Sequence, residues 1–435
     1  MHGYWKMLNL FQIYVSKKWT DLRGKCPEED RRSKINFNRM FIVSNILLRK
    51  AAVSDLYEVF LDTHEKTYQS AIIFLTISAI SFFCLLGLIN NFIHEWDRDM
   101  YKALESMPMI LSAVLAWVEG VVLCVSSKKI KGLLKKIQIL WTRELKDDID
   151  DNIFVTAERS IFFTAFYAIL IFVIGGLYLV VPLVRLVGTF CTTDDDVYTF
   201  DFERRLLPIR YPFRVDNILM YITCTAFEVI SVFFLIIQYT SGDILFFQST
   251  TILSLLLQVT GKKFAEVTEW DDDNKFNRPL LKKLNDIGKQ HSELLKSCRM
   301  IEEVFNPVIL LMIICSSANL CACVIAFESK LSTFELADAV ILVIHFIAMI
   351  LQPLIYCNSA ENISHWTQNI YHTIYTCQWP DQKKKFKHIV FFIMMRSRHN
   401  YKFKAYGLCD VNRHLFYRLV RTAYNIFVLL RKTNT

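Results

Sequence analysis

Apolar segments without lysine or arginine alternate with charged connections along most of the chain. Six segments contain no lysine or arginine: 67–93, 106–126, 161–183, 216–258, 302–327 and 333–357. A helix rises about 1.5 Å per residue, so about 20 apolar residues cross the hydrocarbon core of a bilayer. Because every one of the six segments reaches that length, the pattern predicts six membrane-spanning helices.

The C-terminal stretch 407–432 predicts a seventh helix with a different pattern. His414, Arg418, Arg421 and Asn425 recur at helical spacing, so they share one side of a helix. A helix immersed in lipid would not carry such side chains, whereas a helix among other helices or beside a water-filled path could carry them. Taken alone, the stretch also fits an amphipathic helix on a soluble domain, and the rest of the chain decides against that alternative.

The composition supports an integral membrane protein and gives no sign of an enzyme. The chain has 435 residues, of which 53% are hydrophobic and 34 are Phe, more apolar surface than soluble proteins of this size usually bury. Its 12 cysteines lie mostly inside the predicted spans, where they are expected to pack as small apolar residues. No nucleophile–base spacing, phosphate loop or metal-ligand cluster is visible, so we expect no catalytic site, metal, cofactor or nucleic-acid partner.

The basic residues in the connections predict the orientation of the chain in the membrane. Counted in order before the last helix, the connections carry 12, 2, 8, 5, 9, 1 and 8 lysines and arginines. Basic residues concentrate on the cytoplasmic side. The N-terminus is therefore predicted in the cytoplasm and, after seven spans, the C-terminus outside, which is opposite to G-protein-coupled receptors. Residues 1–66 are charged and mostly polar, so Thr67–Ile93 is expected to act as an uncleaved signal-anchor.

The fourth segment is too long for one membrane crossing. As a single helix, 216–258 would measure about 64 Å, twice a bilayer core. Tyr239–Asp243 interrupts the apolar run, but two spans there would move the basic residues of 259–301 outside. We therefore predict a span over 216–240 and a cytoplasmic continuation over Ile244–Thr260, which other protein must cover.

The fifth and sixth segments and the amphipathic stretch His388–Met395 are the expected cover, and together they predict a packed helical base beneath the membrane. Phe37, Phe41, Ile42, Ile46 and Leu47 recur at helical spacing and predict an amphipathic helix on the membrane or on this base. Residues 261–300 are expected to form a solvated connection with a helix at its end. The predicted parts are a cytoplasmic N-terminal amphipathic region (1–66), spans one to four with a ligand pocket (67–240), the helical base (241–301), spans five and six (302–357), a second part of the base (358–409), and a seventh, pore-lining helix with an outer tail (410–435).

Several short motifs in residues 290–435 carry a family resemblance. Residues 423–431 read Ala-Tyr-Asn-Ile-Phe-Val-Leu-Leu-Arg, and Gln352 with Tyr356-Cys357 stands near the end of the sixth segment. Ile374-Tyr375 with Trp379, and then Met395-Arg396, lie between these two motifs. In order and spacing, the motifs resemble those of the insect odorant receptors.

Two related groups fit less well. The gustatory receptors end in Thr-Tyr, an apolar run and Gln-Phe, whereas Thr422 and Tyr424 are one residue too far apart and no Gln-Phe follows. The shared odorant co-receptor carries a long insertion between spans four and five, for which the connection here is too short. The resemblance therefore implies an odour-tuned subunit.

The resemblance implies an odorant-gated, non-selective cation channel that works in a heterotetramer with co-receptor subunits. Such receptors take small volatile organic ligands in the outer half of each subunit and lie in the lipid bilayer of olfactory sensory neurons. Their last helices line a central pore. By register with that helix, Phe427 and Leu430 would form part of an apolar constriction and Arg431 would lie at its outer rim.

The expected ligand pocket lies where the outer halves of spans two, three and four meet. Phe172, Gly175 and Leu179 share one side of span three, next to Tyr178. Small volatile ligands suit an apolar cavity with one or two hydroxyls. Ordinary helix packing through glycine is the alternative. The candidate ligand-binding residues are Met109, Phe172, Gly175, Tyr178, Leu179, Met220, Tyr221 and Cys224.

Three acidic residues fall inside the predicted spans. Glu119, Glu228 and Asp338 have no basic partner within those segments, so they are either functional groups or carboxyls that hydrogen bonds hold neutral. A transporter or a G-protein-coupled receptor that uses these acids is the alternative from another class. A transporter favours paired repeats with helices interrupted near mid-membrane. The one interruption expected here, at Gly242, lies near the inner face of the membrane instead.

Overall fold

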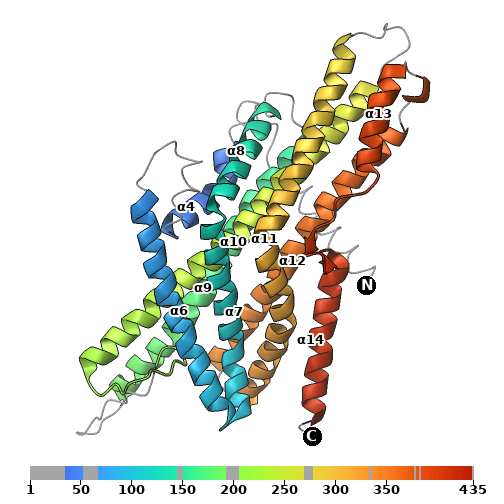
Figure 1. Cartoon of the computed structure of the whole chain (residues 1–435). Helices are drawn as coiled ribbons and strands as arrows, with labels where there is room; N and C mark the ends of the chain where they lie inside the picture. Colours follow the sequence, from blue (N-terminus) through green and yellow to red (C-terminus); the bar gives the residue numbers. More distant parts are fainter. Residues whose placement is uncertain are drawn as a thin grey trace.

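The computed structural model describes a nearly all-helical chain (Figure 1). Residues 35–51, 67–144, 150–192, 205–268, 278–332, 336–376, 379–381 and 384–433 are described. The helices are α3 (Phe37–Met40), α4 (Ile42–Lys50), α6 (Thr67–Trp96), α7 (Met100–Val125), α8 (Ser127–Glu144), α9 (Asp151–Thr192), α10 (Ile218–Thr268), α11 (Arg278–Ser332), α12 (Leu336–Thr376), the short 3₁₀ helix η1 (Trp379–Asp381), α13 (Lys384–Ser397) and α14 (Arg413–Thr433). Two strands, β1 (Lys404–Ala405) and β2 (Cys409–Asp410), pair antiparallel in front of α14.

Six helices in the described part are long and apolar enough to cross a membrane. They are α6, α7, α9, α10, α11 and α12, and each contains one of the six predicted segments. α14 is not among them, because its first half carries Arg413, Arg418 and Arg421. The all-helical membrane architecture is confirmed, whereas the orientation of the termini stays a prediction.

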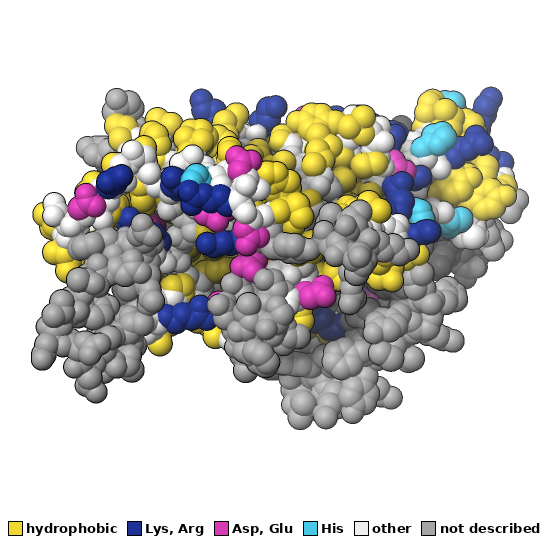
Figure 2. Space-filling view, turned by 90° about the horizontal axis from the view of Figure 1, so that it is seen from below, with side chains coloured by type: hydrophobic (Ala, Val, Ile, Leu, Met, Phe, Trp, Pro, Cys, Tyr) yellow, Lys and Arg dark blue, Asp and Glu magenta, His cyan; other side chains and the backbone are white. Residues whose placement is uncertain are grey.

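The six helices form an elongated bundle in which α10, α11 and α12 run from one end towards the other (Figure 1). α10 packs most extensively against α12 and α11, and α7 packs against α11 and α6. α14 lies along one side of the bundle and contacts α11 and α12. At the lower end, where α6 turns into α7, charged side chains of both signs are mixed with hydrophobic ones (Figure 2), as expected where a bundle meets water.

The predicted interruption of the fourth segment is wrong. α10 runs unbroken through residues 239–243 and has 51 residues, which is about 77 Å of helix. The hydroxyls of Thr240 and Ser241 bond within the helix, to Ile236 O at 2.6 Å and to Ile237 O at 2.7 Å. Gly242 gives room to α7, because a Cβ there would lie 2.5 Å from Glu119 Oε2. These residues therefore serve packing and do not break the helix.

The second half of α10 is buried, as predicted for a helix so apolar. Ile244, Phe246, Leu253 and Leu256 are at most 1% exposed. α11 and α12 supply most of the cover. The stretch His388–Met395 lies in α13, which packs on α12 and, less extensively, on α11.

The helix predicted at the end of residues 261–300 is present, but the solvated connection before it is shorter than predicted. α10 continues to Thr268, α11 already begins at Arg278, and Leu284, Leu294 and Cys298 are completely buried. Mixed charge hid the length and burial of α11 in the sequence, because its polar residues lie on one side and its apolar residues face the base. Three of the predicted boundaries between parts of the chain, at residues 240, 301 and 357, fall inside α10, α11 and α12. The division of the chain into functional parts stays a prediction.

The N-terminal amphipathic helix is present as the short pair α3 and α4, and it packs on the base. Phe37, Phe41 and Leu47 are buried, whereas Ile42 and Ile46 are 47% and 53% exposed. The pair is fixed to α10 by Gln248, whose Nε2 donates to Met40 O at 2.6 Å and whose Oε1 accepts from Ser44 Oγ. Residues 1–34, and with them most of the predicted cytoplasmic N-terminal region, lie outside the described residues.

A two-stranded hairpin, which the sequence reading did not anticipate, positions the start of α14. Tyr406 and Gly407 form its turn with φ of 49° and 74°, and Leu408 N donates to Ala405 O at 2.9 Å. The hairpin is attached to α11, because Lys404 N donates to Glu302 Oε1 at 3.2 Å and Tyr401 Oη also donates to Glu302. Burial and the Glu302 carboxylate raise the pKa of Tyr401, so its hydroxyl stays protonated as a donor.

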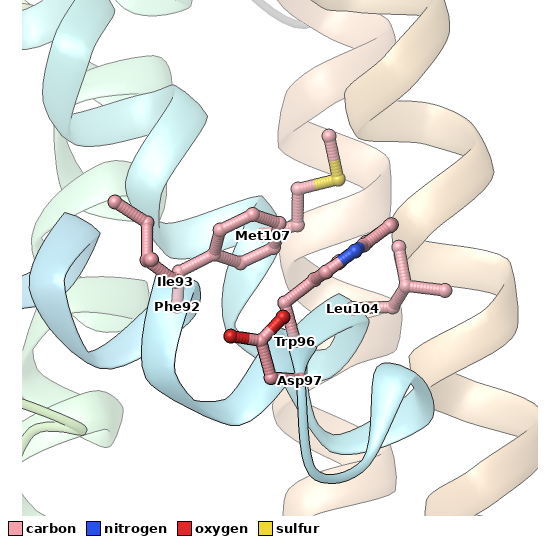
Figure 3. Close-up of a pocket in the computed structure, with 6 residues that line it drawn as sticks. All are labelled: Phe92, Ile93, Trp96, Asp97, Leu104 and Met107. Carbon is pink, nitrogen blue, oxygen red and sulfur yellow. The ribbon is translucent and has the colours of Figure 1, made fainter.

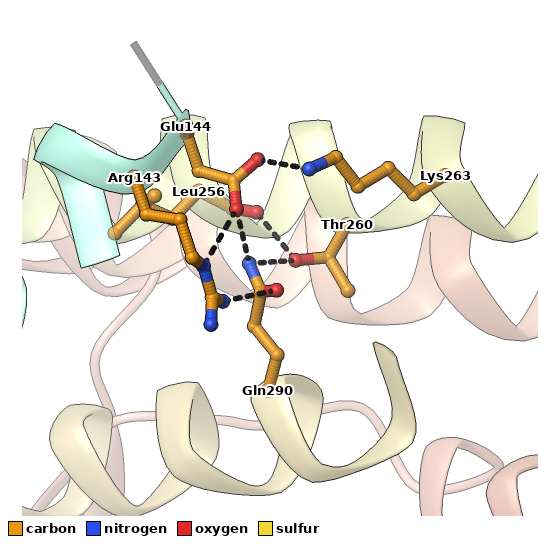
Figure 4. Close-up of polar contacts among 6 residues, drawn as sticks. All are labelled: Arg143, Glu144, Leu256, Thr260, Lys263 and Gln290. Atoms are coloured by element: carbon orange, nitrogen blue, oxygen red, sulfur yellow. Dashed lines mark hydrogen bonds and ion pairs between the residues drawn. The ribbon is translucent and has the colours of Figure 1, made fainter. Parts of the chain in front are cut away.

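A cluster of polar side chains joins α8, α10 and α11 in the base (Figure 4). Glu144 accepts from Gln290 Nε2 at 3.2 Å and pairs with Lys263 Nζ at 2.6 Å. Arg143 Nη2 donates to Gln290 Oε1 at 2.7 Å, so the amide is used at both ends. The Glu144 side chain is only 4% exposed, which means that loss of its carboxylate would leave buried donors without an acceptor.

We predict that Glu144→Ala lowers the free energy of unfolding by about 1–3 kcal/mol, because it removes a buried carboxylate that accepts from Gln290 and pairs with Lys263. The measurement is the thermal transition of the full chain purified in detergent. Asp286→Ala is the control, because Asp286 forms an exposed ion pair with Lys289 at 3.9 Å and should change the transition little. Equal shifts for the two variants would contradict a stabilising role of the cluster.

Candidate functional site

A pocket of about 110 Å³ lies among α7, α9, α10 and α12. It lies beside the N-terminal halves of α7 and α12 and the C-terminal half of α9, which belong to the same end of the bundle. Its wall is mostly apolar. The lining residues are Met109, Ser112, Ala113, Ala116, Ile171, Ile174, Gly175, Tyr178, Leu207, Val232, Leu235, Ile236, Tyr239, His345, Ala348 and Met349.

The structure brings three of the eight candidate ligand-binding residues to this cavity. Met109, Gly175 and Tyr178 line it. Phe172 and Leu179 lie on α9, half-buried and outside the lining. Whether any of these residues binds a ligand stays a prediction.

The remaining three candidates lie elsewhere on α10. Tyr221 and Cys224 belong to a separate buried cluster with Val215, and Met220 packs against it. α10 contributes Val232 to Tyr239 to the cavity, which begins about 16 Å further along the helix than Tyr221. The sequence identified the helix but not the axial position at which it meets the cavity.

The polar part of the cavity wall is centred on a histidine that sequence reasoning missed. His345 is 4% exposed. Its Nε2 lies 3.3 Å from Ser112 Oγ, and its Nδ1 lies 3.3 Å from Tyr178 Oη. The signal in the sequence was a single histidine within the segment 333–357, which contains no lysine or arginine. On its own, that signal does not distinguish a cavity residue from one that packs.

The two adjacent glycines of α9 have different surroundings. A Cβ at Gly175 would lie 2.7 Å from Ile236 Cγ1, closer than side-chain carbons approach each other. At Gly176 nothing lies within 4 Å of such a Cβ. Gly175 therefore permits a close approach of α9 and α10 beside the cavity. Both explanations for this glycine, helix packing and a position at the cavity, apply at once.

A second, open groove of about 360 Å³ lies on the surface where α6 turns into α7 (Figure 3). Phe92, Ile93, Trp96, Asp97, Leu104 and Met107 line it. Trp96 is 46% exposed at the end of α6, a position typical of aromatic residues at the membrane–water interface. The groove shares no lining residue with the pocket among α7, α9, α10 and α12.

Hydrogen bonds link one of the three intramembrane acids, Glu119, to a further buried acid, Asp243, between the cavity and the base. Gln352 Nε2 lies 3.2 Å from Glu119 Oε1 and 3.1 Å from Asp243 Oδ1. Tyr167 Oη donates to Asp243 Oδ2 at 2.6 Å. All four residues are at most 1% exposed. For Glu119, the arrangement agrees with a carboxyl held by hydrogen bonds and not with an ion pair.

The other two acids have different partners, and Asp338 has a basic partner that comes from outside the predicted membrane-spanning segments, in the connection after the third one. Asp338 Oδ2 pairs with Arg185 Nη1 at 2.8 Å, because the end of α9 meets the start of α12. Glu228 accepts from Leu207 N at 3.1 Å and from Tyr211 Oη at 3.0 Å. Burial and the Glu228 carboxylate raise the pKa of Tyr211, so its hydroxyl remains a donor.

The two sides of α14 differ in burial. Leu415, Leu419 and Ala423 are buried, and Ser317 of α11 donates to Leu419 O at 3.3 Å. The opposite side is exposed in the single chain. It carries His414, Arg418, Arg421 and Asn425, the four residues that the sequence placed together. Of the predicted pore residues, Phe427 is half-buried, and the side chains of Leu430 and Arg431 lie outside the described residues.

These features define a helical membrane protein of many spans with a mostly apolar pocket between its helices. The chain belongs to the seven-transmembrane odorant receptor family, because the family model described as 7tm Odorant receptor matches residues 99–424. This match confirms the resemblance and makes α14 the seventh helix. The family consists of receptors, which agrees with the expectation that the chain is not an enzyme.

Curated relatives from Drosophila melanogaster are similar over part of their length. Odorant receptor 67b is 24% identical over 31% of this chain and 32% of its own length, and odorant receptor 67a is 24% identical over 35% and 36%. Putative odorant receptor 92a is 23% identical over 45% of this chain and 47% of its own length. The chain thus matches about a third to a half of the length of these relatives.

A solved structure shares the fold. The insect olfactory receptor OR5 from Machilis hrabei superimposes with a TM-score of 0.66 at 16% identity, over 84% of this chain and 92% of that chain. The same receptor in complex with eugenol gives a TM-score of 0.68 at 15% identity, over 89% and 99%. At these identities the likeness concerns the fold alone.

We predict that Gly175→Ala lowers surface expression of the receptor, because the added Cβ collides with Ile236 and separates α9 from α10. Surface biotinylation of the full chain measures the effect. Gly176→Ala is the matched control and should leave surface expression unchanged, since its Cβ enters open space. If the two alanines behave alike, the close approach at Gly175 does not matter for assembly.

Proposed function

We propose that the chain is the odour-tuned subunit of an odorant-gated, non-selective cation channel, which works as a tetramer with a shared co-receptor. It would act in the cell membrane of olfactory sensory neurons. The pocket among α7, α9, α10 and α12 carries the proposal. Membership in the odorant receptor family supports the assignment of that cavity to an odorant.

The size and chemistry of the cavity suit a small volatile organic ligand. Ligand sites are mostly apolar with a few polar groups that set orientation. Here Ser112, Tyr178, Tyr239 and His345 carry the polar groups in an otherwise largely aliphatic wall. An engineered cavity of about 150 Å³ in another protein holds benzene, so 110 Å³ suits a molecule of comparable or smaller size. The related receptor from Machilis hrabei, solved in complex with eugenol, supports a ligand of this general kind.

The exposed polar side of α14 supports assembly around a pore. His414, Arg418, Arg421 and Asn425 would be costly against lipid, so water or other subunits must cover them in a membrane. A central water-filled path between four such helices meets this requirement. In this arrangement Phe427 and Leu430 would narrow the pore and Arg431 would lie at its outer rim.

A gustatory receptor channel is the nearest alternative, and the odorant receptor family match favours the odorant assignment over it. A transporter or a G-protein-coupled receptor is less well supported. Transporters place their sites at helices broken near mid-membrane. Among the described residues, α10 passes Gly242 without a break, and the acids Glu119 and Asp243 are held by Gln352 and Tyr167.

We predict that Ala348→Leu reduces the odour-evoked current, because Ala348 lines the cavity and is completely buried. The larger side chain would fill part of the cavity and raise the half-maximal odorant concentration at least tenfold, or about 1.4 kcal/mol. The measurement is whole-cell current in cells that express the full chain with and without co-receptor. Ala226→Leu, on the exposed side of α10, is the matched control and should respond like the unchanged chain. An unchanged response of Ala348→Leu at normal surface expression would contradict the cavity assignment.

A separate prediction concerns the pore. Phe427→Ala, expressed with co-receptor, should raise the current in the absence of odorant, because an apolar constriction closes by excluding water. Leu419→Ala is the comparison, since Leu419 faces α11 and its truncation should reduce surface expression and leave the basal current per channel unchanged. No increase in basal current for Phe427→Ala would place Phe427 away from the constriction.

A further inference from the structure

The packing of α9 against α10 gives the cavity two distinct ends. A Cβ at Gly175 of α9 would meet Ile236 of α10. Earlier on α9, Tyr167 reaches Asp243, which lies further along α10. The two helices therefore run antiparallel beside the cavity, so that residues late in α9 lie level with residues early in α10.

The two tyrosines of the cavity wall lie at these opposite ends. Tyr178 is the last residue of α9 at the cavity, and Tyr239 is the last residue of α10 there. α9 lines the cavity from Ile171 to Tyr178 and α10 from Val232 to Tyr239, which is about 10 Å of each helix. Because the helices are antiparallel, the two phenol rings are separated by roughly the length of the cavity.

At the Tyr178 end, the polar side chains bond to one another. Tyr178 Oη lies 3.3 Å from His345 Nδ1, and His345 Nε2 lies 3.3 Å from Ser112 Oγ. Ser112 Oγ also donates to Pro108 O at 2.7 Å. The polar side chains at this end of the cavity therefore have partners within the protein.

At the other end, the hydroxyl of Tyr239 has no such partner. Tyr239 is 4% exposed, and its hydroxyl oxygen is buried without a hydrogen-bond partner among the described residues. The polar groups on the far side of it are engaged with one another, because Gln352 joins Glu119 to Asp243 and Tyr167 donates to Asp243. Of the side chains that line the cavity, all of them described, Tyr239 is the one with a buried and unpaired polar atom. A buried hydroxyl without a partner is unfavourable, and a molecule in the cavity can supply the missing partner.

We infer that Tyr239 is the polar anchor of the odorant, so that the cavity takes small volatiles with an acceptor oxygen in preference to hydrocarbons of the same shape. The inference rests on the proposed function of the cavity as the odorant site. A phenol hydroxyl donates to a carbonyl, an alcohol or an ether oxygen alike. The ligand oxygen would lie at the Tyr239 end, and the hydrocarbon part would lie along the apolar wall towards Tyr178. A hydrocarbon would leave the Tyr239 hydroxyl unpaired.

The first arm of the experiment compares pentan-2-one with 2-methylpentane, in which a methyl group replaces the oxygen. Whole-cell currents are recorded from cells that express the full chain with co-receptor, for the unchanged chain and for Tyr239→Phe. The comparison is made between the two chains for each probe, so differences in solubility between the probes cancel. Tyr239→Phe should raise the half-maximal concentration of pentan-2-one about tenfold and leave that of 2-methylpentane unchanged. No change for the ketone, or an equal change for both probes, would overturn the inference.

The matched control is Tyr178→Phe, the same substitution at the other tyrosine of the same cavity. The Tyr178 hydroxyl is already paired with His345, so its removal should not weaken pentan-2-one relative to 2-methylpentane. A selective loss of ketone sensitivity in Tyr178→Phe, as large as that in Tyr239→Phe, would show that the oxygen is not bound at Tyr239.

The second arm uses the purified full chain in detergent and does not depend on channel activity. Without ligand, Tyr239→Phe should unfold at the same temperature as the unchanged chain or higher, because the hydroxyl it loses has no partner. A lower transition would overturn the inference, since the hydroxyl would then be bonded within the protein.

The same measurement with pentan-2-one separates the inference from the proposed function. The ketone should raise the thermal transition of the unchanged chain more than that of Tyr239→Phe. Equal stabilisation of the two chains, or stabilisation of neither, would overturn the anchor role of Tyr239. If the ketone stabilises the chain through Tyr239 and neither probe evokes a current, the odorant-gated function fails and the anchor stands. If both probes evoke the same currents in both chains, the function stands and the anchor fails.

Discussion

The second half of α10 imposes the main constraint on the molecule, because a helix that is apolar on every side cannot face water. Residues Ile244 to Leu257 are largely enclosed by α11 and α12, which run on from the bundle into the base. Bundle and base are therefore one continuous packing unit. α12 has a particular place in it, because it lines the cavity through His345, Ala348 and Met349 and also contacts α14.

Polar groups enter this apolar interior in a few connected clusters, since a buried group without a partner would be costly. In the base, Glu144 and Gln290 join three helices. Lower in the bundle, the single amide of Gln352 bridges carboxylates from α7 and α10. At the cavity, His345 links α7 to α9. Each cluster joins helices distant in sequence, so a shift of one helix by a turn would separate the partners.

α14 is constrained in a different way, because one of its sides packs on the bundle and the other carries polar residues that need a polar environment. Its leucines meet α11, and a hairpin held by Glu302 fixes where the helix begins. The exposed side, with Arg418 and Arg421, remains uncovered in a single chain. Lipid is a poor cover for those charges, which makes a polar environment supplied by an assembly the consistent solution.

The sequence by itself determined which residues leave water and which helices cross the membrane. A helix needs about 20 predominantly apolar residues to cross the hydrocarbon core of a bilayer, and such a stretch can be recognised from the order of residues alone. The two sides of α14 were likewise visible from the spacing of His414 and Arg418. Only the tertiary structure decided that α10 passes Gly242 unbroken, that Asp338 meets Arg185, and that His345 forms the cavity wall. Helices that are apolar all round carry no periodic signal of rotation or axial position. Which buried residues meet is therefore set by the packing of whole helices against each other.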